Sequence, residues 1–533
     1  MFTSSRSLCT SLSNVNQKST LRSKRISNNN SRHHYLIVVQ SQKQMDDNNN
    51  INNNINNMFS FLNINNNNNN NNEKKNGSKT EMRRGTADSD DTKGRAYLVA
   101  PPPLFPLVPA FKRQTYRYEI EKGKMWFFEQ KQGIGLGLNV SVNVRMTVIK
   151  LKSGGLWVHA PVAPTKECIA LLNELDAPVE HIILPTTLFE HKIFVGPFSR
   201  KFPQAKLWIT QDQWSWPVNL PPKFFGIDYK KNGGGILGDV VENSPKPSWA
   251  DEFEIELLIP PALGVASYVS FIECAFFHKP SRTLLVTDSV VYVSENIPDA
   301  VLERDLMESG DDGSFTITAL KLLNLFDIRE KAKLRTNDSS TMTIEEKRRL
   351  GWQRNALQAL YFGPNNLLDP EESWKFVTNR LFVAPVVATL VYENVPDNVN
   401  DWVKRVSKWN FTRIVPCHFD APIKAGPKEF REAFRFLPSS RVGESSNNYS
   451  KRAGKDSSSS YFNNEDMVLL RAVADFLKNT GVIFTNESRP KKIKVLTNNS
   501  SNSSTSNSST SNSSSSKSRS SFSSRSGKTK AIR

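Results

Sequence analysis

Two histidines and two carboxylates stand within a few residues of short apolar and β-branched stretches that predict strands. They are Glu190 and His191 after EHIILPT, Asp288 after RTLLVT, and His418 after RIVPC. Side chains beyond the carboxyl ends of parallel strands meet at one edge of the sheet, where α/β proteins bind their ligands. Two imidazoles and two carboxylates suit one divalent metal ion such as zinc, iron or manganese. The sequence therefore predicts a metal site formed by Glu190, His191, Asp288 and His418.

Each of these residues also has a structural interpretation, which the sequence leaves open. His191 and Asp288 can instead hydrogen-bond the turn after their strands, and His418 can be a hydrogen-bonded core histidine. A carboxylate of Glu190 or Asp288 that does not bind metal could act as a general base, so these two are the catalytic candidates. Cys417 is interpreted as a buried inert thiol rather than as a thiolate ligand.

The elements that must position these residues follow from the hydrophobic pattern. Strands are predicted at 145–151, 155–161 and 180–186, and the segment 164–175 between the last two has apolar residues at helical spacing. Strand, helix and strand in this order predict a βαβ unit, hence an α/β fold with a parallel sheet. Further elements are expected at 206–210 (strand), 268–277 with 282–287 (hairpin), 370 onward (helix), 399–409 (helix), 413–418 (strand), 427 onward (helix) and 465–479 (helix).

Low-complexity tracts mark the two ends of the chain. Asn dominates from 47 to 72, and Ser and Asn dominate from 498 to 526. Such tracts bury too little apolar surface to offset the entropy of ordering the chain. Residues 1–94 and 486–533 are therefore predicted to be disordered.

The remaining residues are long enough for one large core. Residues 95–440 are predicted to form it, with a charged surface insertion at 329–349. A Ser- and Asn-rich linker at 441–462 then leads to a C-terminal helix within 463–485, which is expected to pack on the core.

The net charge of +18 is concentrated in the predicted tails. The first 45 residues hold seven Lys or Arg and no acid, and the residues from 488 onward hold ten more, again without an acid. Because these account for seventeen of the eighteen charges, the rest of the chain is nearly neutral. A specific nucleic-acid surface is therefore not expected, and binding by the tails would be nonspecific and weakened by salt.

The first 25 residues are rich in Ser and Arg, lack acids, and have no apolar core long enough for a secretory signal. This is the make-up of an organelle transit peptide, with an ordinary basic tail as the alternative. The four cysteines are widely spaced and favour a reducing compartment. The most apolar run, 257–277, contains two prolines and Glu273, so no transmembrane segment is predicted.

The candidate metal residues also resemble a known motif. Metallo-β-lactamase-fold enzymes carry H-x-H-x-D-H after a strand, then a third His, a bridging Asp after a hairpin, and a late His. Laid on IILPTTLFEHK, the motif falls on Thr186, Leu188, Glu190 and His191. Asp288 matches the bridging Asp and His418 the late His, whereas no His lies near 262–264, where the third is expected. The resemblance implies a metallo-β-lactamase-like αββα sandwich that keeps the second metal site and lacks the first.

Two further histidines rank below these four. His159 stands where the superfamily usually has an Asp, which makes it a candidate extra ligand. His278 lies at the predicted hairpin tip and is interpreted as structural.

Longer phrases are similar to an uncharacterised plant, algal and cyanobacterial family, domain of unknown function 4336 (DUF4336). They include RMTVIKL, LWVHAPVAPT, LPTTLFEHKIFVGPFSRKFPQAKLW, FFHKPSRTLLVTD and GWQRNALQALYF, and the resemblance covers most of 95–437. The family implies no activity, but it favours a plastid. A chloroplast location is therefore expected, with the mitochondrion as the alternative.

Two functions remain open. A single-metal hydrolase would lower the pKa of a bound water and attack a small-molecule ester, lactone, thioester or phosphoester. Loss of the first-site histidines instead favours a catalytically inactive member of the fold that serves as a binding or scaffold protein. The substrate, the metal and any protein partner are not determined by the sequence, and no other cofactor is expected.

Overall fold

The computed structural model of the chain describes residues 82–84, 113–134, 140–214, 220–242, 246–260, 271–315, 317–318, 341–361, 367, 370–438 and 461–480. The N-terminal segment with its transit-peptide-like start, apart from 82–84, lies outside the described residues. So do the C-terminal tail, the stretch 262–264, most of the linker and the first part of the expected insertion.

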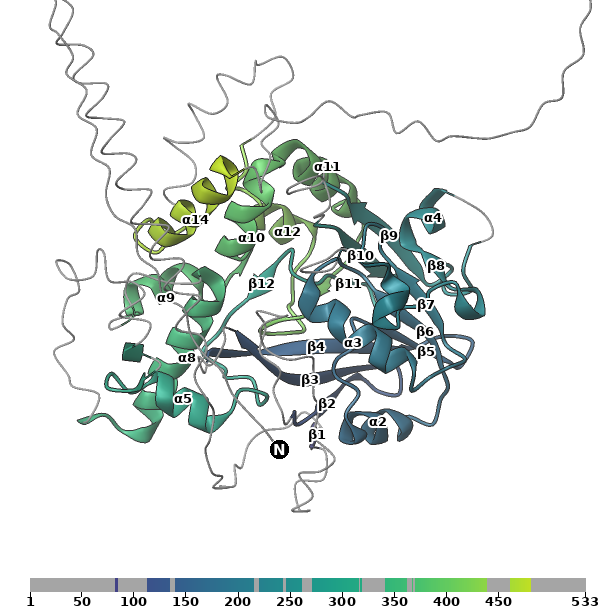
Figure 1. Cartoon of the computed structure of the whole chain (residues 1–533), viewed down its shortest axis with the longest axis horizontal. Coiled ribbons are helices and arrows are strands. Elements are labelled where there is room, and N and C mark those ends of the chain that lie inside the picture. The colour runs from purple at the N-terminus through teal and green to yellow at the C-terminus, as the bar shows by residue number, and fades with distance from the viewer. Residues whose placement is uncertain are drawn as a thin grey trace, which may run out of the picture. The chain divides into compact units, whose positions relative to one another are not determined.

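Among the described residues, eight strands form a first sheet in chain order (Figure 1). They are β1 (Met82–Arg84), β2 (Tyr116–Glu121), β3 (Met125–Ile134), β4 (Val140–Lys150), β5 (Leu156–His159), β6 (Val179–Leu184), β7 (Lys206–Ile209) and β8 (Gly235–Ile236). Pairing is antiparallel from β1 to β5 and parallel from β5 to β8. Helix α2 (Lys166–Asn173) connects β5 to β6, which confirms the predicted βαβ unit.

A second sheet has the order β14-β11-β10-β9. Its strands are β9 (Phe253–Leu258), β10 (Glu273–His278), β11 (Thr283–Leu285) and β14 (Arg413–Val415). Strands β10 and β11 form the predicted hairpin, and β14 pairs with β11 in parallel although it lies far along the chain. The parallel pairing brings the carboxyl ends of β11 and β14 to the same edge of the sheet. A small pair, β12 (Val291–Tyr292) and β13 (Leu381–Phe382), lies outside both sheets.

Side chains on alternate faces of the strands form three hydrophobic layers, one between the two sheets and one on the outer face of each sheet. In β10, Cys274 and Phe276 face a cluster shared with the first sheet, whereas Ala275 and Phe277 belong to the cluster on the opposite side. Trp157 of β5 lies in the shared cluster and stacks on Phe253 of β9, with 4.2 Å between ring centroids. The two sheets therefore pack face to face, as period-2 alternation with two apolar faces requires.

Helices cover the outer face of each sheet. On the first sheet, Leu172 of α2 and Phe198 of α3 (Phe189–Ser199) pack in one cluster with strand residues. On the second sheet, the covering helices are α8 (Ile344–Tyr361), α11 (Pro396–Val406) and α12 (Pro427–Ala433). The described part of the chain is thus an αββα sandwich, which is the architecture of the metallo-β-lactamase fold and confirms the predicted fold class.

The remaining helical segments are α4 (Leu237–Glu242), α5 (Glu303–Ser309), α9 (Glu371–Val377), α10 (Pro385–Leu390), α14 (Met467–Asn479) and the short η3 (Pro222–Phe225), η4 (Lys231–Gly233) and η7 (Tyr392–Asn394). Helix α9 begins directly after Pro370, close to the predicted start. Each described helix is too short or too polar to cross a bilayer.

The two helices with the clearest apolar pattern behave as expected. In α11, Val399, Trp402, Val403 and Val406 are all buried. In α14, Met467 and Leu470 are buried in the same core cluster, and the helix packs against α10. An amphipathic helix gains most of its stability from packing of this kind.

The last residues of the expected surface insertion are helical. Residues 344–349 are largely exposed and form the first turns of α8, whose later residues are buried. Their charges therefore mark the solvated start of a core helix.

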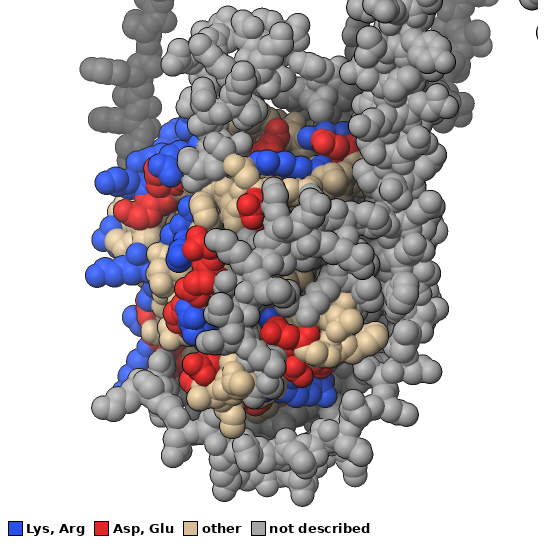
Figure 2. Space-filling view, turned by 90° about the vertical axis from the view of Figure 1, so that its left-hand side faces the viewer, with Lys and Arg blue, Asp and Glu red and all other residues tan. Residues whose placement is uncertain are grey.

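Charges of both signs interleave on the face that carries α5, α8 and α9 (Figure 2). Arg348 of α8 lies 3.0 Å from Glu303 of α5, and Arg349 pairs with both Glu295 and Glu371. Among the described residues of this face, the charges do not form a single-sign patch of the kind that attracts nucleic acid.

Candidate metal centre

Glu190 and His191 lie in the first turn of α3, which begins after a short loop at the end of β6. Thr187 ties this loop to the second sheet, because its N–H donates to the carbonyl of Ile272 (3.1 Å) and its hydroxyl accepts from the Ile272 N–H (2.9 Å). The loop is thus fixed at the edge where the two sheets meet.

Asp288 and His418 are brought together by the parallel pair β11 and β14. The pairing continues past both strands, since Val286 N–H donates to Val415 O (3.1 Å) and Cys417 N–H donates to Thr287 O (3.1 Å). The residues that follow, Asp288 and His418, therefore leave the sheet side by side. Their positions at strand ends agree with the sequence-based expectation.

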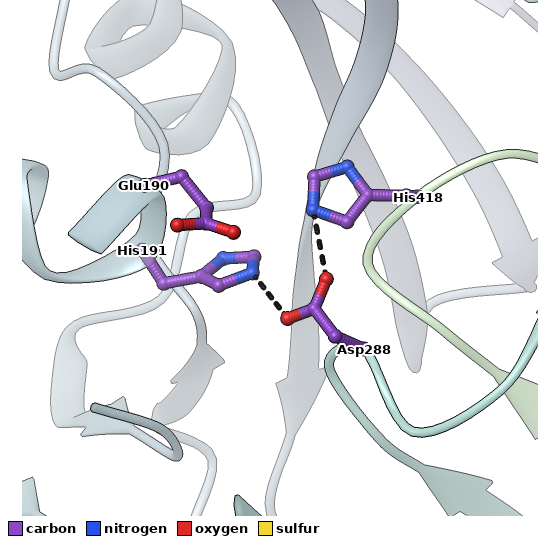
Figure 3. A group of neighbouring side chains, drawn as sticks. All are labelled: Glu190, His191, Asp288 and His418. Atoms are coloured by element: carbon purple, nitrogen blue, oxygen red, sulfur yellow. Dashed lines mark hydrogen bonds and ion pairs between the residues drawn. The ribbon is translucent and has the colours of Figure 1, made fainter. Parts of the chain in front are cut away.

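The four predicted residues form one cluster, with their side chains pointing toward one another (Figure 3). Nε2 of His191 lies 3.2 Å from Oδ2 of Asp288, and Nε2 of His418 lies 3.3 Å from Oδ1 of the same carboxylate. One ligand atom from each of the four residues falls within 4.8 Å of the others. His191, His418 and Asp288 are at most 9% exposed, and Glu190 is partly buried.

The tautomer of His418 follows from its second nitrogen. Nδ1 lies 2.8 Å from the backbone carbonyl of Asn143, and a carbonyl oxygen can only accept, so Nδ1 carries a proton. Burial lowers the pKa of His418, which favours the neutral ring. In that ring Nε2 bears a lone pair, and this lone pair faces the Asp288 carboxylate.

A buried polar network on β3 and β4 holds the His418 loop. Arg145 donates from Nε to Glu129 (2.7 Å) and from Nη1 to the carbonyl of Pro416 (2.6 Å). The Asn143 amide donates to the Phe419 carbonyl (3.1 Å), and its oxygen accepts the Phe419 N–H (2.8 Å). These contacts flank His418 on both sides and fix its orientation.

The pKa values within the cluster shift in opposite directions. Burial and the Asp288 charge raise the pKa of Glu190, against the opposing effect of His191. Burial alone would raise the pKa of Asp288, but the hydrogen bond and charge of His191 lower it overall. Burial alone would lower the pKa of His191, yet the hydrogen bond and charge of Asp288 and the charge of Glu190 raise it. Asp288 is thus the carboxylate that stays ionised.

The positions that match the first metal site hold no metal ligands. Thr186 is fully buried, and its hydroxyl accepts the N–H of Leu188 (3.2 Å). Leu188 is the residue that precedes α3. Among the described residues, the candidate metal cluster contains only the residues that match the second site.

The lower-ranked candidates lie apart from the ligand cluster. His278 is the last residue of β10, at the end of the hairpin opposite to Asp288, and contacts Ser281 (2.6 Å). His159 packs against Trp157 and Phe276, and burial together with the charge of His191 lowers its pKa to about 3. Burial raises the pKa of the Cys417 thiol well above its usual range, in agreement with an inert thiol.

Glu273 was not among the predicted site residues, although it lies beside them. It is the first residue of β10, it is fully buried, and its Oε1 accepts the N–H groups of Thr287 (2.9 Å) and Ser289 (3.3 Å). Burial and the Asp288 charge raise its pKa to about 7. The sequence signal that could have identified Glu273 was a single carboxylate within an apolar run. Asn143 and Arg145 were missed too, because both stand within a strand pattern.

The architecture and the cluster together define a metallo-β-lactamase-type fold with candidate ligands at one metal position. The chain belongs to the family described as Domain of unknown function (DUF4336), which matches residues 122–372 and 368–436.

Several solved structures are similar to the chain at low identity. The DIM-1 metallo-β-lactamase exposed to ceftazidime is 10% identical, with 62% of this chain and 97% of that chain covered and a TM-score of 0.27. The Flv1 flavodiiron core from Synechocystis sp. PCC6803 is 11% identical, with 70% and 71% covered and a TM-score of 0.34. A flavoprotein from Thermotoga maritima is 9% identical, with 61% of each chain covered and a TM-score of 0.31. No curated protein matches the chain.

Proposed function

We propose that the chain holds one divalent metal ion through Glu190, His191, Asp288 and His418, and that it is a metal-dependent, hydrolase-like protein. The observation that carries the proposal is the contact between His418 Nε2 and Asp288 Oδ1. The carbonyl bound at Nδ1 leaves Nε2 as an acceptor, and it faces another acceptor at 3.3 Å. Two facing acceptors repel each other unless a metal ion or a proton lies between them, and burial disfavours the proton on His418 because it lowers the pKa of that ring.

The donor set fits such an ion. Ligand atoms on one tetrahedral zinc lie about 3.3 Å apart, given metal–ligand distances near 2 Å. The two imidazole nitrogens lie 3.2 and 3.3 Å from the oxygens of Asp288. Two ionised carboxylates also balance the charge of a divalent ion, and mixed nitrogen and oxygen ligands suit zinc, iron or manganese.

A divalent ion at this position would lower the pKa of a bound water and polarise an ester, lactone, thioester or phosphoester. The protein's own part is to hold the imidazoles and Asp288 in place and to keep Asp288 ionised. Glu190, whose pKa is raised, is the better candidate for a general base if it leaves the ion.

A second candidate function is a catalytically inactive member of the fold that binds or organises partners. The observation that favours it is the replacement of two first-site histidines by Thr186 and Leu188, both engaged in the loop before α3. A mechanism that needs a hydroxide bridging two ions is not supported by the described residues.

The metal content of the purified protein distinguishes the two candidate functions. We expect the purified full-length protein to contain close to one equivalent of zinc, iron or manganese, measured by elemental analysis. The His191→Ala/His418→Ala double variant should contain none while remaining folded by circular dichroism. His278→Ala, which removes a buried histidine from the end of β10 beside the hairpin turn, is the matched control and should keep the metal. Metal-free wild-type protein, even after reconstitution, would leave the scaffold function.

We further propose import into a plastid, with the mitochondrion as the alternative. The support is the acid-free, Ser- and Arg-rich composition of the N-terminus, which lies outside the described residues. A fluorescent protein fused behind residues 1–94 is expected to enter plastids. Uniform cytosolic fluorescence would overturn this proposal.

A further inference from the structure

We propose that Glu273 is a positioning residue of the metal site, which fixes the Asp288 carboxylate by accepting the backbone N–H groups on both sides of it. The inference rests on the proposed function, since it takes Asp288 to be a ligand. Glu273 lies on another strand and is not itself one of the four clustered residues.

The register of the hairpin explains why this residue is in place. Phe276 pairs with Leu285 and His278 with Thr283, so continuing the register by three residues would place Glu273 opposite Asp288. The ladder between β10 and β11 stops at Leu285, however, and beyond it the backbone–backbone bonds of Val286 and Thr287 go to the β14 side, at Val415 and Cys417. Beyond this point the Glu273 side chain, rather than the β10 backbone, accepts the hydrogen bonds from the β11 side.

The two N–H groups need an acceptor because they are inside the protein. Thr287 and Ser289 are both fully buried, and an unpaired buried N–H is strongly unfavourable. Oε1 of Glu273 serves both, at 2.9 and 3.3 Å. The residue between them, Asp288, is therefore held at its two flanking peptide groups.

Glu273 also connects the two halves of the site through its backbone. It forms a bridge with Thr186, and the next N–H, of Cys274, donates to the carbonyl of Pro185 (2.7 Å). That loop leads into the helix turn with Glu190 and His191. One residue thus sets the position of the Asp288 turn relative to the α3 ligands, which is the role that outer contacts have around metal sites.

Three variants of the full-length chain test the inference. Glu273→Ala removes the acceptor, Glu273→Asp shortens its reach while adding little empty volume, and Glu273→Gln keeps an oxygen at the same distance. Glu252→Ala is the matched control. Glu252 is also buried and accepts a backbone N–H, from Lys152 at 2.9 Å, but it lies at the hairpin-turn end of the sheet beside His278.

The first readout is metal binding, measured by zinc competition with a chromophoric chelator and by the visible spectrum of the Co²⁺-loaded protein. Loss of an outer contact typically weakens metal binding by about 10- to 100-fold, and we expect this for Glu273→Ala and Glu273→Asp. Their Co²⁺ spectra should change as well. Glu273→Gln and Glu252→Ala should bind zinc and give Co²⁺ spectra like the wild type.

The second readout needs no metal. Amide hydrogen exchange at Thr287 and Ser289 should accelerate in metal-free Glu273→Ala and Glu273→Asp and stay slow in Glu273→Gln. Unchanged exchange in the first two would overturn the backbone contact. Unchanged zinc affinity and Co²⁺ spectra in variants that do exchange faster would overturn the positioning role while leaving the proposed function intact. A wild type that binds no metal would overturn the proposed function and the positioning role together, whatever the exchange rates.

Discussion

The buried imidazoles of this protein differ in what their ring nitrogens contact, and this decides their roles. His418 donates from Nδ1 to a carbonyl, which leaves Nε2 as an acceptor at the ligand cluster. His181 accepts from Trp208 at Nδ1 (3.1 Å), so its Nε2 carries the proton and donates to Ser248 (3.0 Å). His159 has an Nε2 with no partner among the described residues. Residue type alone does not separate a ligand from a core histidine.

His159 should make stability depend on pH. Its pKa is about 3 in the folded protein and about 6.5 in an unfolded chain, so between these values only the unfolded state binds the proton. The free energy of unfolding therefore falls as the pH drops through this window, by about 1.4 kcal/mol per pH unit from this residue. His159→Phe, which keeps an aromatic ring against Trp157 and Phe276, should remove that component.

Urea unfolding of both proteins at pH 7, 6 and 5 would check this prediction. The other titrating groups are common to both, so the difference between the two pH profiles isolates His159. Parallel profiles would show that His159 is not held neutral by burial.

Strand β4 contacts the candidate metal site directly, whereas helix α11 contributes only to the packing of the fold. Strand β4 carries Asn143 and Arg145, whose polar side chains hold the His418 loop inside the protein. Helix α11 touches the site at no described contact and instead covers the second sheet with an apolar face. Changes in the two elements should therefore have different consequences.

Arg145→Met should lower the free energy of unfolding by about 3–5 kcal/mol, because it leaves the Glu129 carboxylate buried without its cationic partner and with only the Asn143 amide as a donor. The double variant Glu129→Met/Arg145→Met should recover part of this loss, since it removes both buried charges. Chemical denaturation of the two single variants and the double variant gives the comparison. A double variant as unstable as the sum of the singles would contradict the assigned pairing.

Trp402→Ala should lower the free energy of unfolding by about 3–5 kcal/mol through the cavity it leaves. Trp402 is fully buried, and its ring N–H donates to the Glu256 carbonyl at 3.1 Å. The folded variant should keep its metal, unlike the ligand variants. Lys404→Ala, at an exposed position of the same helix, is the control and should change stability by less than about 0.5 kcal/mol. Loss of metal from folded Trp402→Ala would show that α11 does act on the site.

On the scale of the whole molecule, the core extends past the region that the family covers. The family matches the chain up to residue 436, yet Tyr461, Phe462, Met467 and Leu470 pack into the large core cluster. Tyr461 donates to the carbonyl of Ala433 in α12 (2.6 Å). Helix α14 is thus a stabilising part of the fold.

Truncated proteins should show which terminal segments contribute to the stability of the core. A protein of residues 82–487, which keeps β1 and every other described element, is expected to unfold at the same Tm as the full chain and to keep its metal. A protein that ends at 438 loses α14, and each buried Leu or Met side chain removed costs about 1.5–3 kcal/mol, so its Tm should fall by several degrees. Differential scanning calorimetry measures both. Equal Tm values for the two truncated proteins would show that α14 does not stabilise the core.

Local patterns determined much of this protein. The βαβ unit, the hairpin before Asp288 and the apolar face of α11 all follow from the periodicity of apolar residues and from turn formers, which act within a few residues of one another. The positions of Glu190, His191, Asp288 and His418 after strands were therefore visible in the sequence, and so was their likeness to a metal motif.

Only the tertiary structure decided what those residues contact. His418 is bound by Asn143, 275 residues away, and the turn at Asp288 is held by Glu273 across the hairpin. No periodicity reports such contacts, because they depend on which strands become neighbours and where their pairing stops. The sequence by itself thus determined the elements and the candidate ligands. The pairing of β11 with β14 and the packing of the two sheets decided that the ligands meet, which way the His418 ring is oriented, and that Glu273 belongs beside them.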